Sequence, residues 1–270
     1  MGITVSAINV YPVKGLKGIA LESAECTDRG IRHDRRWMVV DGEGVFLSQR
    51  SHPRMATVWT ELTDSALVLS APDEDSVEIS LDPPPAGSMK VQVWNSICDA
   101  VPASREADLW LSRYLETPVR LVYMPDDSVR HSNNKYAGEG KRLGFADGYA
   151  YLVISEASLA DLNARLAAKK HPALPMNRFR PNIVLAGSEA YAEDTMGEVR
   201  IGAATLRGVK PCGRCQVTTT DQATGEVTGP EPLLTLASYR DSSEFGQMFG
   251  MNMVSVRPGL VRVGDAVITP

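Results

Sequence analysis

The sequence has few of the residues that mark several classes of protein. It contains 4 cysteines in 270 residues, too few for the disulfide framework of a small secreted protein, so a reducing, cytoplasmic environment is expected. No run approaches 18 consecutive apolar residues, which predicts that no segment spans a membrane. The N-terminus lacks the charged and apolar regions of a signal peptide, so no secretion signal is expected.

Basic residues are also fewer than acidic residues. Lysine and arginine together number 28 against 33 aspartates and glutamates, which gives a net charge of −5. This balance argues against a nucleic-acid partner, because such proteins need a basic face. Local groups of basic residues could still bind a small anion. The apolar content of 43% is ordinary for a globular protein, and the length fits one large domain or two smaller ones.

Short strands dominate the first hundred residues. Apolar and polar residues alternate as strands require, and residues 36–47 predict a hairpin whose loop is residues 41–44. Residues 82–87 predict a loop rich in proline. The spacing of the strands is typical of a barrel or sandwich. The other strands are expected over residues 3–13, 16–26, 66–70, 77–81 and 90–94.

Helices are expected only in the later part of the chain. Ser104 precedes an apolar face with helical spacing over residues 107–115, and Ser158 precedes another helix. Residues 125–148 are polar and glycine-rich, which predicts a functional loop or lid. Residues 260–269 predict a closing hairpin. The fold class is therefore α+β, mostly β, with a domain boundary near residue 118.

The stretch over residues 210–221 is the most distinctive. It places Cys212 and Cys215 as a CxxC pair beside Lys210 and Arg214, followed by three threonines that prefer strand structure. A structural zinc site needs four ligands, and the histidines are scattered. A thioredoxin-type pair opens a helix, which the threonines disfavour.

Two further interpretations of the cysteine pair stay open. Both cysteines could be small core residues, although flanking cations are unusual in a core. Alternatively, one thiolate, favoured by the neighbouring cations, could ligate a soft transition metal. The remaining ligands would come from a chelator with sulfur donors, such as a pterin dithiolene on molybdenum. The residues alone do not choose among the four interpretations.

A resemblance to a known family favours the last interpretation, a thiolate that ligates a metal. Residues 211–215, followed by the threonines and by Asp221 and residues 224–225, resemble the signature of MOSC-domain proteins. Residues 11–15 and 33–37 resemble the β-barrel domain that precedes MOSC in the amidoxime-reducing components. Four more segments resemble the same group: residues 155–163, 179–184, 191–194 and 245–247. Together the matches cover nearly the whole chain in order.

The resemblance implies an N-terminal β-barrel-like domain over residues 1–118, followed by a MOSC β-barrel domain with a few helices over residues 119–270. It implies an oxidoreductase with a molybdenum–molybdopterin cofactor that reduces N-hydroxylated compounds, such as amidoximes and hydroxylamines. Cys215 would be catalytic and the metal ligand, and Asp147 would be catalytic and face the substrate. The residues implied in cofactor binding are Lys14, Gly15, Arg35, Gly148, Tyr149, Arg180, Asn182, Gly213, Arg214 and Cys215.

Three of these positions depart from the family pattern. Gly15, Gly148 and Tyr149 stand where relatives carry hydroxyl-bearing residues, so backbone amides would have to serve there. Arg178 and Arg180 lie on one face if this segment is a strand, and Arg180 is preferred because it matches the family motif. Three tryptophans are expected in the core: Trp37, Trp94 and Trp110.

The resemblance also implies partners. Some bacterial relatives carry an added iron–sulfur domain, but this sequence has no cysteines after Cys215. Electrons are therefore expected from a separate ferredoxin-, flavodoxin- or cytochrome b5-type protein with its reductase. We expect a bacterial, cytoplasmic protein with no nucleic-acid or membrane partner. The alternative function is a carrier or transfer module for sulfur or molybdenum cofactor that uses a cysteine persulfide. A non-catalytic, zinc-stabilised module is a third hypothesis.

Overall fold

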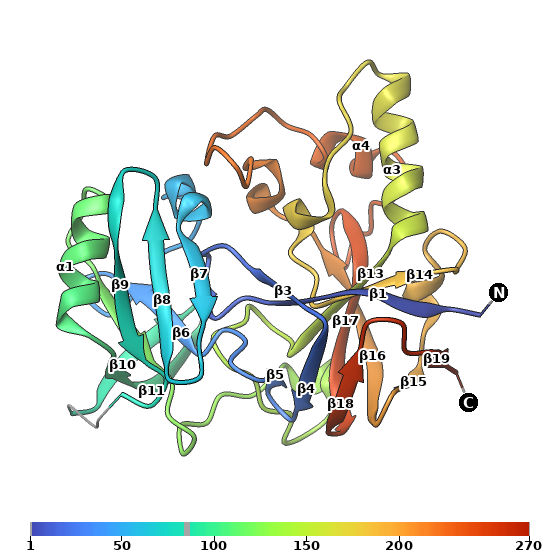
Figure 1. Ribbon diagram of the computed structural model, residues 1–270. Helices are drawn as coiled ribbons and strands as arrows, with labels where there is room; N and C mark the ends of the chain where they lie inside the picture. The colour runs from blue at the N-terminus through green and yellow to red at the C-terminus, as the bar shows by residue number, and fades with distance from the viewer. Residues whose placement is uncertain (1, 84–86, 270) are drawn as a thin grey trace.

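The computed structural model describes residues 2–83 and 87–269 (Figure 1). The expected α+β, mostly β fold is confirmed, with 38% of residues in strands and 18% in helices. The centre of the predicted loop at 82–87 lies outside the described residues, as do residues 1 and 270. Among the helices of the described residues, none is both long enough and apolar enough to cross a membrane.

The strands and helices are numbered in chain order, and Figure 1 labels many of them. The first strands are β1 Thr4–Val10, β2 Val13–Lys14, β3 Ile19–Leu21, β4 Ser23–Thr27, β5 Gly30–Ile31, β6 Trp37–Val40, β7 Trp59–Leu62, β8 Ala66–Ala71, β9 Glu74–Ser80, β10 Met89–Val93, β11 Ser96–Pro102 and β12 Arg120–Tyr123. The later strands are β13 Tyr151–Ser155, β14 Ile183–Ala186, β15 Glu198–Ile201, β16 Ala204–Gly213, β17 Met248–Arg257, β18 Gly259–Arg262 and β19 Val267–Ile268. The α-helices are α1 Arg105–Tyr114, α2 Asn134–Ala137, α3 Glu156–Ala168 and α4 Leu233–Ala237; the 3₁₀ helices are η1 Pro53–Thr57, η2 Met176–Phe179, η3 Ala192–Thr195 and η4 Gln216–Thr219.

The largest sheet has eight strands in the order β19-β15-β16-β17-β13-β14-β1-β3. Its pairs are antiparallel except β13 with β14. The segment leading into β19 also bonds to β1, through Val5 N to Asp265 O at 2.9 Å and Val267 N to Ile3 O at 2.8 Å. The sheet therefore curls round on itself, as a barrel requires.

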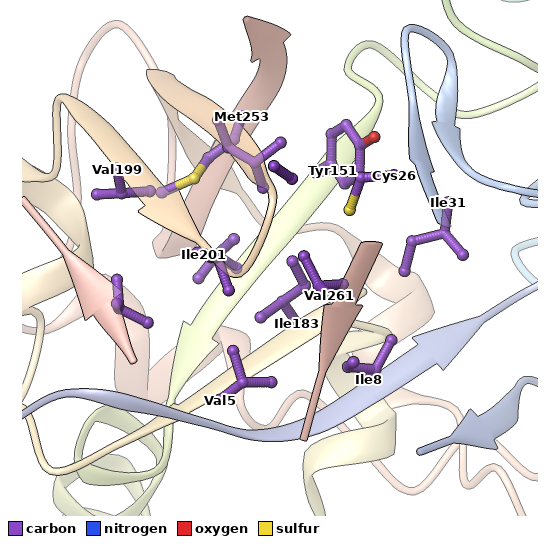
Figure 2. Packing of buried hydrophobic residues seen from close by; sticks show 14 of the residues in the cluster. Val5, Ile8, Cys26, Ile31, Tyr151, Ile183, Val199, Ile201, Met253 and Val261 are labelled. Atoms are coloured by element: carbon purple, nitrogen blue, oxygen red, sulfur yellow. The ribbon is translucent and has the colours of Figure 1, made fainter. Parts of the chain in front are cut away.

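Strand β1 completes this sheet, although it comes from the start of the chain. Ile8 pairs with Ile183 of β14, and Figure 2 shows the side chains of Val5 and Ile8 in the same buried cluster as Ile183 and Val261. Their burial removes apolar surface from water and so holds the two ends of the chain together. Residues before position 118 are thus part of the sheet formed mainly by residues after 119.

A second group of strands lies to the left in Figure 1. It forms a five-stranded sheet in the order β10-β11-β12-β6-β2 and a three-stranded sheet in the order β7-β8-β9. Helix α1 contacts β9 and β12. The prediction of this helix is confirmed, because the hydroxyl of Ser104 accepts a hydrogen bond from Ala107 N at 3.2 Å as an N-cap. Its apolar face is buried, including Trp110 and Leu111.

The predictions for the closing hairpin and for the threonine run are wrong. The expected closing hairpin does not form, because β18 pairs with β4 and β19 pairs with β15. The threonine run is the 3₁₀ helix η4 rather than a strand. The hydroxyls of Thr218 and Thr219 donate to the carbonyls of Cys215 and Gln216, at 2.9 and 2.8 Å. A threonine hydroxyl can satisfy a carbonyl of the preceding turn in this way, which offsets its preference for strands.

Candidate functional site

A cleft that opens to solvent is lined by all the residues that the sequence assigns to a site. They come from five separated segments: β2 with the turn after it, the β5–β6 turn, the residues before β13, the residues between η2 and β14, and the end of β16 with the turn that follows. The fold therefore places these segments around one cavity. The roles of the individual residues stay predictions.

Two arginines share one aromatic ring in this cleft. The guanidinium carbons of Arg35 and Arg180 lie 4.2 and 4.3 Å from the ring centre of Tyr11. Burial, opposed by Tyr11 and reinforced by the charge of Arg35, lowers the pKa of Arg180 to about 10. The Nη2 atom of Arg180 is buried with no hydrogen-bond partner among the described residues. An unpaired buried donor of this kind is costly unless a ligand completes it.

A buried carboxylate holds Arg35 in place. Asp34 is 3% exposed, and its oxygens accept from Arg35 Nη1 at 2.7 Å, Asn182 Nδ2 at 3.1 Å and Tyr11 N at 2.9 Å. Asn182 Oδ1 accepts from Leu152 N and from Arg35 Nη1, both at 3.2 Å. Both polar atoms of the Asn182 side chain are therefore engaged within the protein, and this residue serves to position Arg35.

Lys14 and Asp147 form an ion pair at the wall of the cleft. Lys14 is buried, with a side chain that is 8% exposed, whereas the Asp147 side chain is 67% exposed. Burial lowers the pKa of Lys14, although Asp147 opposes this effect. The charge of Lys14 and hydrogen bonds from Lys14 and Trp94 hold the pKa of Asp147 below its usual range. Asp147 therefore stays ionised at neutral pH.

The neighbours of Asp147 leave space in the cleft. A Cβ atom added at Gly148 would meet no atom within 4 Å. The next residue, Tyr149, is half-buried, and burial raises its pKa to about 12. Its hydroxyl is therefore protonated at neutral pH and can donate a hydrogen bond into the cleft. The carbonyl of Gly15, next to Lys14, accepts a bond from Gln49 Nε2 at 2.7 Å.

The cysteine pair lies at the end of β16. Cys212 and Cys215 are both half-buried and both line the cleft. Arg214 donates from Nη1 to Cys212 Sγ at 3.1 Å and from Nη2 to Phe179 O at 2.7 Å, and its backbone N donates to Gln247 O at 2.7 Å. The sulfur of Cys215 has no hydrogen-bond partner among the described residues, so it is the sulfur that is left open to a ligand.

Glycine is required at position 213. A Cβ atom there would lie 2.0 Å from the carbonyl oxygen of Phe245, far inside any van der Waals contact. The backbone of residues 212–215, the cysteine loop, packs directly on the segment before β17. This packing fixes the position of Cys215, which follows the end of β16.

The cleft carries a marked excess of positive charge in a protein whose net charge is −5. Of the charged side chains that line it, Asp147 is acidic and the others are basic: Lys14, Arg35, Arg50, Arg180 and Arg214. Among the described residues, no group of three or more His, Cys, Asp or Glu side chains is placed to hold a metal ion. This arrangement suits an anion and gives a zinc site no ligand set.

The structure corrects two predictions about side chains near the site. Trp94 is not a core residue; it is half-buried and lines the cleft, whereas Trp37 and Trp110 are buried as expected. Arg178 does not share a face with Arg180, because both lie in or after the 3₁₀ helix η2 rather than in a strand. Arg178 is buried and paired with Asp221 at 2.8 Å.

Several lining residues escape sequence reasoning. Gln49 is 1% exposed and bonds both Gly15 and Gln222, whose Nε2 donates to Gln49 Oε1 at 2.8 Å. Phe46 and Arg50 lie beside it on the cleft wall. The one available signal is the polar run of residues 48–51 directly after an apolar strand segment, a place where binding loops commonly occur.

Comparison with known proteins identifies the family of this chain. Residues 2–118 match the family described as "MOSC N-terminal beta barrel domain", and residues 140–268 match "MOSC domain". The chain is 34% identical to "Mitochondrial amidoxime-reducing component 1" of Homo sapiens, over 98% of this chain and 82% of that protein. The mouse counterpart (Mus musculus) is 35% identical over 98% and 81%. The division of this chain after residue 118 stays a prediction.

A second relative of Homo sapiens is also similar to this chain. "Mitochondrial amidoxime reducing component 2" of Homo sapiens is 32% identical over 98% of this chain and 82% of that protein. These names contradict the expectation of a bacterial, cytoplasmic protein, because the relatives are mitochondrial proteins of animals. That expectation rested on few cysteines and no signal peptide, and neither feature separates one reducing compartment from another. The chain belongs to the MOSC-domain family of the amidoxime-reducing components.

Proposed function

We propose that the chain is a molybdenum-cofactor-dependent reductase of N-hydroxylated compounds such as amidoximes and hydroxylamines. The name of the relatives supports N-reduction at the level of the family. The net reaction takes two electrons and two protons, breaks the N–O bond and releases the oxygen as water. The cofactor would supply the two-electron redox chemistry, and the protein would bind it, orient the substrate and exclude competing reactions.

The observation that carries the proposal is the combination of an open thiol and a cationic cleft. Cys215 lines the cavity and its sulfur has no hydrogen-bond partner among the described residues. Five basic side chains and one acidic side chain line the same cavity. A thiolate can ligate a soft metal, and guanidinium groups bind phosphate through paired hydrogen bonds. The residues present therefore fit a metal–pterin phosphate.

We assign the phosphate end of the cofactor to Arg35 and Arg180. Both guanidinium groups pack against the ring of Tyr11. The Nη2 atom of Arg180 has no hydrogen-bond acceptor among the described residues, and a phosphate oxygen would supply one. Arg35 is held by Asp34 and Asn182, so little conformational entropy is lost when it binds. We assign the metal end of the cofactor to Cys215.

Other residues shape the remaining walls. Gly148 gives the cofactor room, Gly15 contributes its backbone to the cleft wall, the Tyr149 hydroxyl donates a hydrogen bond, and Gly213 with Arg214 fixes the loop that carries Cys215. Lys14 holds Asp147 ionised, and Asp147 faces the substrate. Electrons come from a separate redox protein of ferredoxin, flavodoxin or cytochrome b5 type.

The test is to measure molybdenum and pterin in protein purified from a host that makes the cofactor. Wild type is expected to hold both near stoichiometry and to reduce an arylamidoxime with an artificial electron donor. Cys215→Ser should lose the metal and the activity. Cys212→Ser is the matched control, because Cys212 lines the same cleft but its sulfur already accepts a bond from Arg214; it should keep the metal.

Two results would overturn the proposal. Metal retained in Cys215→Ser would remove Cys215 as the ligand. Wild type without metal or pterin, together with a mass increase of one sulfur atom on Cys215, would favour the carrier or sulfur-transfer function.

A further inference from the structure

Arg178 lies behind the wall of the cleft, where the segment before Arg180 meets the segment after Cys215. Its side chain is 4% exposed, and it does not line the cleft. The helix that carries it, η2, contacts η4, which begins directly after Cys215. A buried guanidinium group is costly unless a counter-charge and hydrogen bonds compensate it. The partners of Arg178 are therefore the groups whose positions it fixes.

The guanidinium group of Arg178 donates to three groups of one loop. Nη1 donates to the carbonyl of Thr219 at 3.1 Å and to the hydroxyl of Thr228 at 3.2 Å. Nη2 donates to Asp221 Oδ2 at 2.8 Å. A carbonyl, a hydroxyl and a carboxylate thus converge on a single planar set of donors, which lysine cannot offer.

Asp221 is itself held in one orientation. Its Oδ1 accepts from the backbone N of Ala223 at 2.8 Å and of Thr224 at 3.2 Å, which leaves Oδ2 for Arg178. These backbone bonds and the charge of Arg178 hold the pKa of Asp221 below its usual range. The carboxylate is therefore ionised at neutral pH and pairs with Arg178 as a fixed charge.

The bond to Thr219 reaches Cys215 through η4. The helix spans Gln216–Thr219, with Cys215 as its N-cap residue. At its start, Thr218 donates to the carbonyl of Cys215 from its backbone N at 3.0 Å and from its hydroxyl at 2.9 Å. At its end, Arg178 binds the Thr219 carbonyl. One turn of helix therefore joins Arg178 to the backbone of the open thiol.

A second bond joins the same two segments in the opposite direction. Arg214 of the cysteine loop donates from Nη2 to the carbonyl of Phe179 at 2.7 Å. The next residue, Arg180, has a φ angle of 55°, in the left-handed region that such residues adopt only where the surrounding structure imposes it. The segment of Arg180 and the segment of Cys215 are thus tied by one arginine from each side.

We infer that Arg178 is a positioning residue that fixes Cys215 relative to Arg180, so that the two ends of the cofactor site form one rigid unit. A ligand held at both ends needs a constant spacing between them, and residues behind the site supply it. Without Arg178, the phosphate end keeps its side chains and the thiol end becomes mobile. This inference rests on the proposed function and adds to it a residue outside the cleft.

The first test uses cofactor-free protein. In Arg178→Gln, iodoacetamide should alkylate Cys215 about tenfold faster than in wild type, the factor expected when one hydrogen bond of a charged group is lost. Trypsin cleaves after Arg214, so Cys212 and Cys215 fall in separate peptides and each rate is read by mass. The control is Arg29→Gln. Arg29 is also buried, also donates to one loop and does not line the cleft, so its loss should leave the rate of Cys215 unchanged.

A milder variant serves if Arg178→Gln does not fold. Asp221→Asn keeps an oxygen for the two backbone donors but removes the charge that pairs with Arg178, so it should accelerate the alkylation of Cys215 as well. A wild-type rate at Cys215 in a folded Arg178→Gln or Asp221→Asn protein would overturn the inference. So would an equal acceleration in Arg29→Gln.

The second test uses protein purified from a host that makes the cofactor. Wild type should contain pterin and protect Cys215 from alkylation. Arg178→Gln should keep its pterin, because Arg35 and Arg180 remain, yet leave Cys215 reactive, whereas Arg29→Gln should match wild type. Pterin retained with Cys215 fully protected in Arg178→Gln would contradict the inference. If wild type holds no pterin, the proposed function fails, and the alkylation of cofactor-free protein still decides whether Arg178 positions Cys215.

Discussion

Asp34 and Asn182 are 148 positions apart in the sequence and are joined by a buried hydrogen bond of 3.1 Å. The same carboxylate binds Arg35 and the backbone N of Tyr11. One side chain therefore links the first strand of the protein, the arginine of the β5–β6 turn and the segment that enters β14. The geometry of the cationic cleft depends on this link.

Replacing Asp34 should weaken both the fold and the cleft. Asp34→Ala leaves Arg35 without its carboxylate partner and Tyr11 N without an acceptor, while Asn182 Nδ2 keeps its bond to Asn9 O at 3.2 Å. The free energy of unfolding should fall by about 3–5 kcal/mol, the usual cost of breaking a buried ion pair by removing one partner. Urea denaturation measures the change. Glu25→Gln is the control, since its pair with Arg32 is exposed and should matter by less than about 1 kcal/mol. Equal midpoints for Asp34→Ala and wild type would contradict the role given to Asp34.

The four cysteines should differ strongly in reactivity. Cys26 is 0% exposed and lies in the core cluster beside Tyr151 (Figure 2), where burial raises its pKa to about 12. Only about one Cys26 side chain in ten thousand is then a thiolate at pH 8, and the thiolate is the form that reacts. In cofactor-free protein, iodoacetamide should label Cys215 and Cys212 first, as peptide masses would report.

The pH dependence of labelling follows from the same pKa. The rate for Cys26 should keep rising about tenfold per pH unit up to a pH of about 12, as long as the fold persists. Urea-unfolded protein is the control, in which all four cysteines should react alike. Labelling of Cys26 in the folded protein at the rate of Cys215 would show that this core opens freely.

Arg180 should not be replaceable by lysine. A lysine keeps the charge but loses the planar pair of donors that matches phosphate. Arg180→Lys should bind the cofactor about ten- to a hundredfold more weakly, which appears as pterin lost during purification. Arg54→Lys is a matched control, because Arg54 also lies 4.3 Å from a tyrosine ring centre but outside the cleft. Pterin retained equally in both variants would contradict the assignment of Arg180.

Local sequence patterns predicted those elements whose determinants are local. Helix α1 carries its own cap and apolar face, and the loop at 41–44 closes on itself through a bond from Asp41 N to Val45 O at 2.9 Å. Helix α3 shows the limit of such patterns. Its N-cap is Ser155 rather than Ser158, because the Ser158 hydroxyl donates to the buried Glu193 at 2.7 Å. That partner is 35 residues away and invisible to a local pattern.

The site was predictable where a motif carries it and not elsewhere. Cys215 and Arg180 follow from the resemblance, whereas composition alone left four interpretations of the cysteine pair. Hydrophobicity predicts Trp94 in the core, because nothing in a run of alternating residues reveals that its indole N–H donates to a residue 53 positions later. Local patterns place strand β1 with its sequence neighbours, and it does pair with β3. Its other partner, β14, lies about 180 residues further on, beyond the reach of a local pattern.

Two glycines of the cleft give a matched pair of substitutions. Gly213→Ala places a Cβ atom 2.0 Å from the carbonyl oxygen of Phe245, so the backbone of either β16 or the segment before β17 must move. Gly148→Ala adds the same atom where nothing lies within 4 Å. Gly213→Ala should therefore lower the free energy of unfolding by about 1–3 kcal/mol, the range for overpacking, whereas Gly148→Ala should leave it within about 0.5 kcal/mol.

The two variants should also differ in what they do to the site. Because Gly213 lies two residues before Cys215, a shift of its backbone displaces the sulfur, so Gly213→Ala should lose molybdenum even at temperatures where it is fully folded. Gly148→Ala should keep the metal, and the added methyl group, which narrows the cleft, should act on the KM for substrate instead. Metal analysis of the folded proteins, paired with urea denaturation, separates these effects. A Gly213→Ala protein with wild-type stability and full metal content would mean that the cysteine loop is not fixed by its packing on Phe245.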